Sequence, residues 1–294
     1  MEFFSLNGKI INMSKKYIFY CERKNYKFFE DYIKSIFTKL KSPELVLYSD
    51  KFDVELSFTT RYNKKNKTKH IFMFMIPENL ELKQNMYLCN TEQLTRHKWK
   101  KYVCELLNKG IKILDYSEEN IHMMSECSND ISRFNIFHMP YQVNESEILN
   151  LNKISDVCIV GSKNDRRVKI YKELKKRGVK VNYVFGWNDE RDKKMFKHKI
   201  LLNIHYDDNY NITEQMRINR CIFNKMLVIS VPSDHKEYLS LKKYIIFSNY
   251  DTIVEKTIHI LKNYEKYYEM FYNNFDNELK NIDKKLSEKL EIIN

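Results

Sequence analysis

Proline and glycine are scarce in this sequence, which holds four prolines and five glycines among its 294 residues. Chains that stay disordered are usually rich in these residues and poor in large apolar side chains. Here 43% of the residues are hydrophobic and 14% are aromatic. The composition therefore excludes a disordered or low-complexity protein and predicts a folded chain that is long enough for two domains.

Long hydrophobic runs and paired cysteine motifs are also missing. No apolar run reaches the roughly eighteen residues that span a membrane, and the N-terminus has no hydrophobic signal-peptide segment. The six cysteines include no C-x-x-C pair, and none has a histidine at zinc-finger spacing. We therefore expect buried free thiols in a cytoplasmic protein without a transmembrane segment.

The net charge of +12 suggests an affinity for anions, yet lysine far outnumbers arginine, as an AT-rich coding sequence would produce. Two basic stretches stand out, "YNKKNKTKH" at 62–70 and "RHKWKKY" at 96–102. No aromatic stacking signature accompanies them, so a solvated loop and a solvated helix face are the alternatives to a nucleic-acid surface. We expect no nucleic-acid partner, and a basic nucleic-acid-binding protein is the third of our functional hypotheses.

From residue 155 onward, short apolar runs alternate with helical segments, a pattern typical of βαβ units and a parallel sheet. It predicts a Rossmann-like domain over residues 151–250. The expected strands are "DVCIVGS", "VKVNYVFG", "KILLNIH", "KMLVISV" and "KKYIIFS".

The first half of the chain, residues 1–150, is less regular but of the same kind. Its expected strands are "KYIFYCE", "ELVLYS", "HIFMFMIP", "NMYLCN" and "KILDYS", with helices near 26–41, 91–109 and 117–127 and a linker around 140–153. Residues 251–294 form a long helical pattern, which we expect to break near Asn273 and to lie back across both domains. A coiled-coil homodimer is the alternative for this segment.

Open α/β sheets bind ligands at the carboxyl ends of their strands, so the residues after each strand are the candidate site. In the second half these are Gly161, Ser162, Gly186, Trp187, Asn203, His205 and Ser230. The Gly161–Ser162 turn runs into a helix N-terminus, where free backbone N–H groups favour a phosphate. Arg166 and Arg167 in the first helical turn would bind the same anion, or else point into solvent.

Glu214 and Arg217 open a later helix toward the same rim. Two alternatives stay open for this pair: a capping box in which Glu214 pairs with Asn211, and an intrahelical ion pair between Glu214 and Arg217. Nothing recurs at fixed spacing beside His205 to complete a set of metal ligands, so we expect no metal. P-loop, zinc-protease and serine-hydrolase motifs are absent from the sequence, as is the dinucleotide fingerprint.

The run "DVCIVGSKNDRRVKIYKELKKRGVKVNYVFG", followed by "KILLNIH" and "EQMRINRCIFNKMLVIS", resembles the donor half of GT-B glycosyltransferases, especially the single-chain glycosyltransferase-like proteins of giant DNA viruses. "YLCNTEQLT" and "FHMPYQVNESE" in the first half resemble the same group. The resemblance implies a viral protein with two facing Rossmann-like domains, in which the second holds a nucleotide-sugar donor and the first holds the acceptor. Glycosyl transfer without a metal or cofactor is the activity that it implies.

The resemblance also assigns roles to residues. Arg167 stands where related proteins contact the donor diphosphate, and Glu214 stands where they place a donor-contacting acid. The second glutamate of the retaining families is missing, because Ile222 lies eight positions after Glu214 and Arg220 stands where related proteins carry another acid. A catalytically inactive GT-B scaffold that acts as a binding or assembly subunit is therefore our second functional hypothesis.

An inverting reaction also needs a base from the first domain to deprotonate the acceptor hydroxyl. The strand-end candidates are Glu22, Glu78, Glu92 and Asp115, and the sequence does not rank them, so the catalytic residue stays unknown. The expected partners are a nucleotide-diphosphate sugar and an acceptor that is a glycan, a lipid or a protein, with a homodimer possible.

Overall fold

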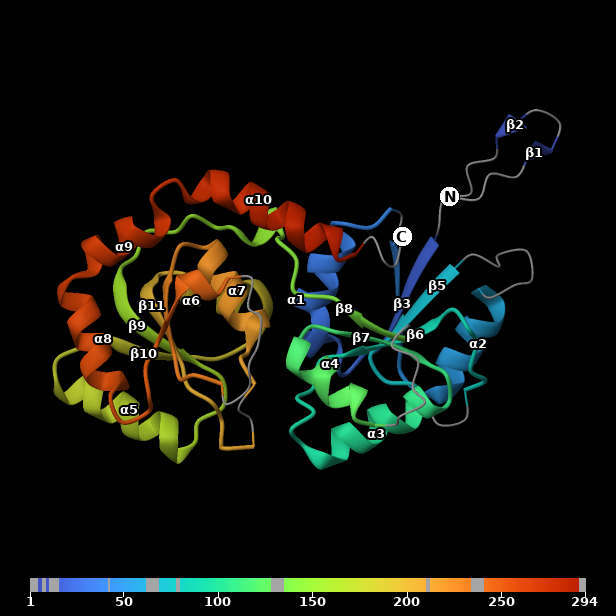
Figure 1. Cartoon of the computed structure of the whole chain (residues 1–294), viewed down its shortest axis with the longest axis horizontal. Coiled ribbons are helices and arrows are strands. Elements are labelled where there is room, and N and C mark those ends of the chain that lie inside the picture. Colours follow the sequence, from blue (N-terminus) through green and yellow to red (C-terminus); the bar gives the residue numbers. More distant parts are fainter. Residues whose placement is uncertain are drawn as a thin grey trace.

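The structure is a computed structural model that describes residues 5–6, 9–10, 16–41, 43–61, 69–77, 80–127, 135–209, 212–233 and 241–290. Two parallel sheets with flanking helices lie side by side, and a helical segment follows them (Figure 1). A separate pair of two-residue strands, β1 (Ser5–Leu6) and β2 (Lys9–Ile10), is antiparallel. The predicted α/β class, GT-B-like with two Rossmann-like units and a C-terminal helical segment, is confirmed.

The N-terminal sheet has the strand order β4-β3-β5-β6-β7-β8 within the described residues, and all its pairs are parallel. Its strands are β3 (Lys16–Glu22), β4 (Pro43–Tyr48), β5 (Lys69–Met73), β6 (Met86–Asn90), β7 (Lys112–Asp115) and β8 (Ile136–His138). Its helices are α1 (Tyr26–Phe37), α2 (Lys51–Arg61), α3 (His97–Asn108) and α4 (Glu118–Ser125). The sequence did not predict β8, which is three residues long, or α2, which directly follows β4.

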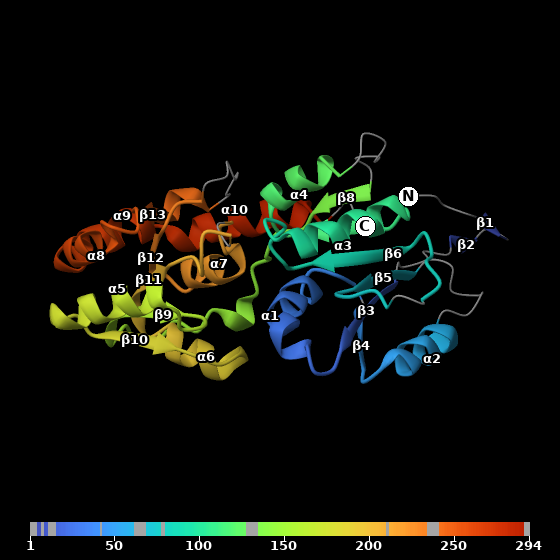
Figure 2. The same ribbon diagram turned by 90° about the horizontal axis from the view of Figure 1, so that it is seen from below.

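Alternating side chains of β3 belong to two separate cores, as the pleat of a strand requires. Tyr17 and Phe19 pack with α1, while Ile18 and Tyr20 pack with α2, α3 and α4. Seen from below, the two domains meet where α1 lies next to α6 (Asn188–Met195), a helix of the second domain (Figure 2). This junction is one wall of the site described below.

The C-terminal sheet has the order β10-β9-β11-β12-β13, again entirely parallel within the part of the chain that is described. Its strands are β9 (Ser155–Val160), β10 (Val181–Val184), β11 (His198–Asn203), β12 (Leu227–Ser230) and β13 (Ile245–Phe247), with helices α5 (Asp165–Lys176), α6 (Asn188–Met195) and α7 (Gln215–Phe223). Short 3-10 turns occur at η2 (Glu145–Glu147) and η3 (Lys242–Tyr244). The strand order reverses between β9 and β11, and such a switch point is where doubly wound sheets open a crevice.

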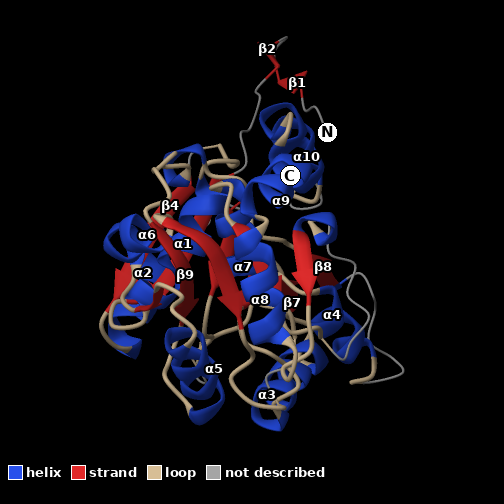
Figure 3. Ribbon diagram, turned by 90° about the vertical axis from the view of Figure 1, so that its left-hand side faces the viewer, coloured by secondary structure: helices blue, strands red, loops and turns tan. Residues whose placement is uncertain are grey.

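Three helices end the chain: α8 (Ile253–Lys262), α9 (Tyr264–Tyr272) and α10 (Phe275–Glu288). The expected break near Asn273 is confirmed, because Asn274 takes a left-handed conformation with φ of +65° between α9 and α10. Helices surround the strands of both sheets (Figure 3), and α10 runs from the second sheet toward the first, where Asp283 pairs with Lys39 at 2.5 Å (Figure 1). Several apolar side chains of this segment, including Phe275 and Leu286, are buried within the chain.

Two of the six cysteines form a disulfide, so the expectation of free thiols throughout is wrong at these positions. Cys104 on α3 is bonded to Cys127, just after α4, with their Cα atoms 5.5 Å apart. The two cysteines lie 23 positions apart in the sequence. They come close only because of the way α3 packs against α4, which their spacing in the sequence does not reveal. The other four cysteines are free and buried. None of the described helices is long and apolar enough to cross a membrane.

Candidate functional site

A cavity of about 510 Å³ lies between the two domains. The carboxyl ends of β6, β7, β9 and β10 reach it, which is the position where parallel α/β sheets bind ligands. Six of the eleven residues predicted from the sequence line it: Gly161, Ser162, Gly186, Trp187, Glu214 and Arg217. The other five predicted residues, Arg166, Arg167, Asn203, His205 and Ser230, are not part of its lining.

Gly161 forms a bare turn at the end of β9. Its φ of +112° is a conformation that side chains with a Cβ rarely adopt. A Cβ at this position would lie 2.9 Å from Nη1 of Arg167 and 3.4 Å from Nη2 of Arg217. The glycine therefore lets two guanidinium groups approach the backbone at the floor of the cavity.

Arg167 is buried beneath this turn and does not point into the cavity. Its Nε and Nη2 donate to the Ile204 carbonyl at 3.0 and 2.7 Å, and its Nη1 donates to the Ser162 carbonyl at 2.9 Å. The guanidinium thus fills the crevice between the ends of β9 and β11. The resemblance implied that Arg167 contacts the donor diphosphate directly. These hydrogen bonds argue against that contact, because Nε, Nη1 and Nη2 of Arg167 all donate to backbone carbonyls.

Arg166, one residue earlier, is directed to the outside of the domain. Its guanidinium lies over the ring of Tyr250 at 5.1 Å and pairs with the exposed carboxylate of Asp208. Successive helix residues point about 100° apart, so the two arginines could not both face the same ligand. Arg166 therefore lies away from the cavity, partly buried against Tyr250 and Asp208, and it neither faces a ligand there nor points freely into solvent.

Arg217 faces the cavity and is held by two partners. Its Nη2 lies 2.5 Å from Oε2 of Glu214, and its Nη1 donates to Oδ1 of Asn203 at 3.1 Å. The intrahelical ion pair is therefore present, and Glu214 is itself the N-cap residue of α7 without a side-chain capping bond. Asn211, the partner in the capping-box alternative, lies outside the described residues.

One carboxylate serves both guanidinium groups at this turn. Glu214 pairs with Arg217 and lies 3.8 Å from Nη2 of Arg167. Burial, and then the charge of Arg217, lower the pKa of Arg167 from its usual value. Among the described residues, the ion pairs of these two arginines both go to Glu214, so the turn at Gly161 carries an excess of positive charge.

Asn203 and His205 lie behind the cavity wall. Asn203 donates from Nδ2 to Oγ of Ser230 at 3.0 Å and thereby fixes the oxygen that holds Arg217. His205 is buried, with Nε2 at 3.3 Å from the Pro232 carbonyl. Within the described residues no group of three or more His, Cys, Asp or Glu side chains is arranged to hold a metal ion.

The end of β10 supplies an aromatic wall. Phe185 and Trp187 flank Gly186, whose φ is +104°. Trp187 meets Phe28 of α1 edge to face, with ring centroids 4.8 Å apart. Phe28 and Trp187 come from different domains, so the cavity is assembled by both.

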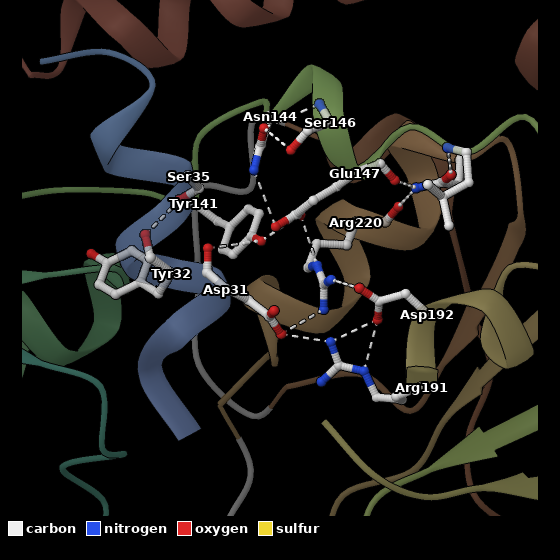
Figure 4. A network of polar contacts seen from close by, with 12 residues as sticks. Asp31, Tyr32, Ser35, Tyr141, Asn144, Ser146, Glu147, Arg191, Asp192 and Arg220 are labelled. Carbon is white, nitrogen blue, oxygen red and sulfur yellow. Dashed lines mark hydrogen bonds and ion pairs between the residues drawn. The ribbon is translucent and has the colours of Figure 1, made fainter. Parts of the chain in front are cut away.

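A cluster of ion pairs joins the two domains at one side of the cavity (Figure 4). Arg220 is buried and binds Asp31 of α1 at 2.9 Å, Glu147 of η2 at 2.9 Å and Asp192 of α6. Arg191 binds the same Asp31 at 2.5 Å and Asp192 at 2.7 Å. Burial raises the pKa of Glu147, although Arg220 opposes the shift. The signal for this cluster in the sequence is Arg220, which stands where the resemblance places an acid.

The four candidate bases of the first domain occupy different environments. Glu92 lines the cavity, and burial raises the pKa of its carboxyl, with Arg96 opposing the shift. Asp115 is buried in hydrogen bonds with Asn90 and Asn120. Glu22 pairs with Lys24 away from the cavity. Glu78 lies outside the described residues.

No protein-family model matches the chain. It is 34% identical to the uncharacterized protein L140 of Acanthamoeba polyphaga mimivirus over 81% of this chain and 78% of that protein. It is 31% identical to protein R358 of the same virus, over 65% of this chain and 68% of R358. The mimivirus protein L137 is 36% identical over 88% of this chain, which spans only 35% of the length of L137.

A solved structure with a similar arrangement is the UDP-GlcNAc 2-epimerase from Neisseria meningitidis bound to UDP-GlcNAc. Its sequence is 10% identical, and the superposition covers 88% of this chain and 94% of that one with a TM-score of 0.39.

Proposed function

The chain belongs to the family of the mimivirus proteins L140 and R358, and we propose that it is a glycosyltransferase that moves a sugar from a nucleotide-diphosphate sugar to an acceptor hydroxyl. The observation that carries this proposal is the turn at Gly161. Two guanidinium groups converge on a bare backbone there, and a single carboxylate, that of Glu214, pairs with both, which leaves a net positive charge. An anion with two phosphates suits such a turn, because backbone N–H groups and Arg217 can both donate to it.

The rest of the cavity lining suits a ligand that is anionic at one end and rich in hydroxyl groups at the other. Three arginines line it, Arg191, Arg217 and Arg220, together with three carboxylates. The carboxylates are Asp31, Glu92 and Glu214. Carboxylates accept hydrogen bonds from sugar hydroxyls but repel a polyanion, so a nucleotide sugar fits this lining better than a nucleic acid does.

In the transfer step, bond cleavage leaves negative charge on the departing nucleoside diphosphate. Arg217 stabilises this negative charge from the cavity side, and the positive charge of Arg167 beneath the turn adds to that stabilisation. Glu92 faces the same cavity from the first domain and is the group that we assign to take the proton from the acceptor hydroxyl. Burial raises the pKa of Glu92, which makes its carboxylate a stronger base than that of an exposed glutamate. The host cytoplasm is the proposed site of action.

A binding subunit without transfer activity is the second candidate, and the ion pairs of the cavity favour it. Arg191 and Arg220 are both paired with Asp31, so part of the cationic lining is already neutralised within the protein. Binding of a nucleotide sugar without turnover would identify this second function.

Thermal unfolding against a panel of UDP-, GDP- and TDP-sugars and their free nucleotides tests the binding step. A ligand at a hundredfold excess over its dissociation constant stabilises by about 2.7 kcal/mol, which is visible as a shift of the midpoint. We expect a shift with nucleotides of one base that is lost in Arg217→Gln. Arg177→Gln is the matched control, because Arg177 is an exposed, ion-paired arginine at the far end of α5.

Stabilisation by no nucleotide, in a protein that unfolds cooperatively, would contradict the proposal. Equal stabilisation of the wild type and Arg217→Gln would also contradict it, because the ligand would then bind elsewhere.

A further inference from the structure

The contact between α1 and α6 has two layers, one aromatic and one ionic. Phe28 and Trp187 form the aromatic layer. One helical turn further along each chain segment, Asp31 and Arg191 form the ionic layer, with Nη2 and Oδ2 2.5 Å apart. All four side chains line the cavity, so each domain presents an aromatic ring followed by a charged group.

The aromatic layer is unusually exposed for a contact between domains. Phe28 is 46% exposed and Trp187 is 44% exposed, and the neighbouring Phe185 is 48% exposed. Nine large hydrophobic side chains are exposed among the described residues, and three of them are these cavity residues. Apolar rings gathered in one cavity mark a ligand surface more often than rings scattered singly over a protein.

The geometry of the rings selects the kind of ligand. The planes of Phe28 and Trp187 cross at 88°, so they form a corner and not a parallel slot. A flat nucleobase is best held between parallel faces, whereas the puckered ring of a sugar can place its apolar C–H face on one ring and its edge against the other. The Asp31 carboxylate behind the corner accepts hydrogen bonds from hydroxyls, which a lipid chain would not offer.

We propose that Phe28, Trp187 and Phe185, together with Asp31, form the acceptor subsite and that the acceptor is a carbohydrate. This assignment rests on the proposed glycosyl transfer and deepens it, because it selects a glycan over a lipid or a protein as acceptor. Asp31 orients a hydroxyl of the bound ring, and the aromatic corner holds the face of that ring. Phe28 and Asp31 belong to the first domain, on the opposite side of the cavity from the turn at Gly161.

The two tryptophans of the chain make a direct test possible, since they are Trp99 and Trp187. In a Trp99→Phe background the emission of Trp187 reports on this subsite alone. Probes are the methyl glycosides of glucose, galactose, mannose and N-acetylglucosamine, their disaccharides, and UMP, GMP and TMP. We expect at least one saccharide to shift the emission saturably, whereas the nucleotides leave it unchanged.

A second substitution in that background shows whether the corner binds the saccharide. Phe28→Leu keeps the apolar volume but removes the ring face, and it should weaken saccharide binding about tenfold. Phe52→Leu is the matched control, because Phe52 is an exposed phenylalanine of the same domain that lies outside the cavity. This control should bind the saccharide as tightly as the background protein does.

Three outcomes would overturn the assignment: emission that responds to nucleotides and not to saccharides, emission that responds to neither, and equal saccharide affinity in Phe28→Leu and its control. These failures are separable from failure of the proposed function. Nucleotide stabilisation through Arg217 would persist if only the acceptor subsite were wrong, and it would vanish if the donor site were wrong.

Discussion

At the scale of single residues, the site depends on what Gly161 lacks. Gly161 and Gly178 both have positive φ, +112° and +80°, but a Cβ would meet two guanidinium groups only at Gly161. Alanine at either position strains the backbone by about 1–2 kcal/mol. We expect Gly161→Ala to lose more stability than Gly178→Ala and also to lose nucleotide binding, which Gly178→Ala keeps.

Thermal unfolding with and without the stabilising nucleotide measures both effects of these alanine variants. Equal behaviour of the two would contradict the role that we give to the bare turn.

Glu92, which we propose as the base of the transfer step, carries a buried carboxyl whose protonation also affects stability. Burial raises its pKa above 4.5, so the folded state binds this proton more tightly than the unfolded state does. The contribution of Glu92 to stability is therefore greatest below pH 4.5 and declines as pH rises through the raised pKa, where the desolvated carboxylate becomes charged.

Glu92→Gln removes this titration, and we expect the variant to be more stable than the wild type at pH 7. The same variant should lose about 10²- to 10⁴-fold in transfer rate, the usual contribution of a general base. Glu105→Gln, at an exposed position of α3, should change neither property. Unfolding curves at several pH values check the first effect, and a lower stability of Glu92→Gln at pH 7 would contradict it.

At the scale of helices and strands, the sequence predicted the site best through the glycine and polar residues that directly follow a strand. The strands over 155–230 are nearly continuous apolar runs followed by glycine or polar residues, and the ends of β9 and β10 reach the cavity. The direction of each side chain was not predictable. Arg167 and Arg217 were both candidates, and only the packing of β9 against β11 places the first under the turn and leaves the second facing the cavity.

The ion cluster around Arg220 joins α1, α6, α7 and η2. Arg220→Met leaves the carboxylates of Asp31, Glu147 and Asp192 without their shared partner in a buried position. Removal of one member of a buried ion pair typically costs about 3–5 kcal/mol. We expect denaturant unfolding to show a loss of this size, whereas Arg177→Met should stay within about 0.5 kcal/mol of the wild type. If Arg220→Met unfolded with the same free energy as the wild type, the cluster would not be what holds the domains together.

The C-terminal helices offer a second comparison at this scale. Phe275, at the start of α10, is 1% exposed, whereas Met270 on α9 is 61% exposed. Phe275→Ala should cost about 3–5 kcal/mol through the cavity that it creates, and Met270→Ala should cost almost nothing. Thermal unfolding of the two variants measures the difference. Similar midpoints would mean that α10 does not depend on this buried ring.

At the scale of the whole molecule, several connections between described residues hold the domains around the cavity. The ion cluster closes one side, and α10 crosses to the first domain through the pair of Lys39 and Asp283. At a third point, Gln93 exchanges two hydrogen bonds with the backbone of Ile212, each 3.2 Å long. The sequence predicted two Rossmann-like units but not these connections, because each joins residues that lie more than seventy positions apart.

These connections explain why the cavity contains groups from both domains in the same chain. The turn at Gly161 with Arg217 belongs to the second domain, and Glu92, Phe28 and Asp31 belong to the first. Transfer between two substrates requires such an arrangement, since the donor and the acceptor must meet in one water-poor space. A protein that only bound a nucleotide would not need Glu92 on the opposite side.

The most direct test of this account measures the release of nucleoside diphosphate from the nucleotide sugar that stabilises the protein, with and without the saccharide that shifts Trp187 emission. Glycosyl transfer predicts release that the saccharide accelerates, that falls about 10²-fold or more in Glu92→Gln, and that persists in Glu105→Gln. Tight binding of the nucleotide sugar without any release, in the presence of the saccharide, would contradict it and identify the chain as a binding subunit.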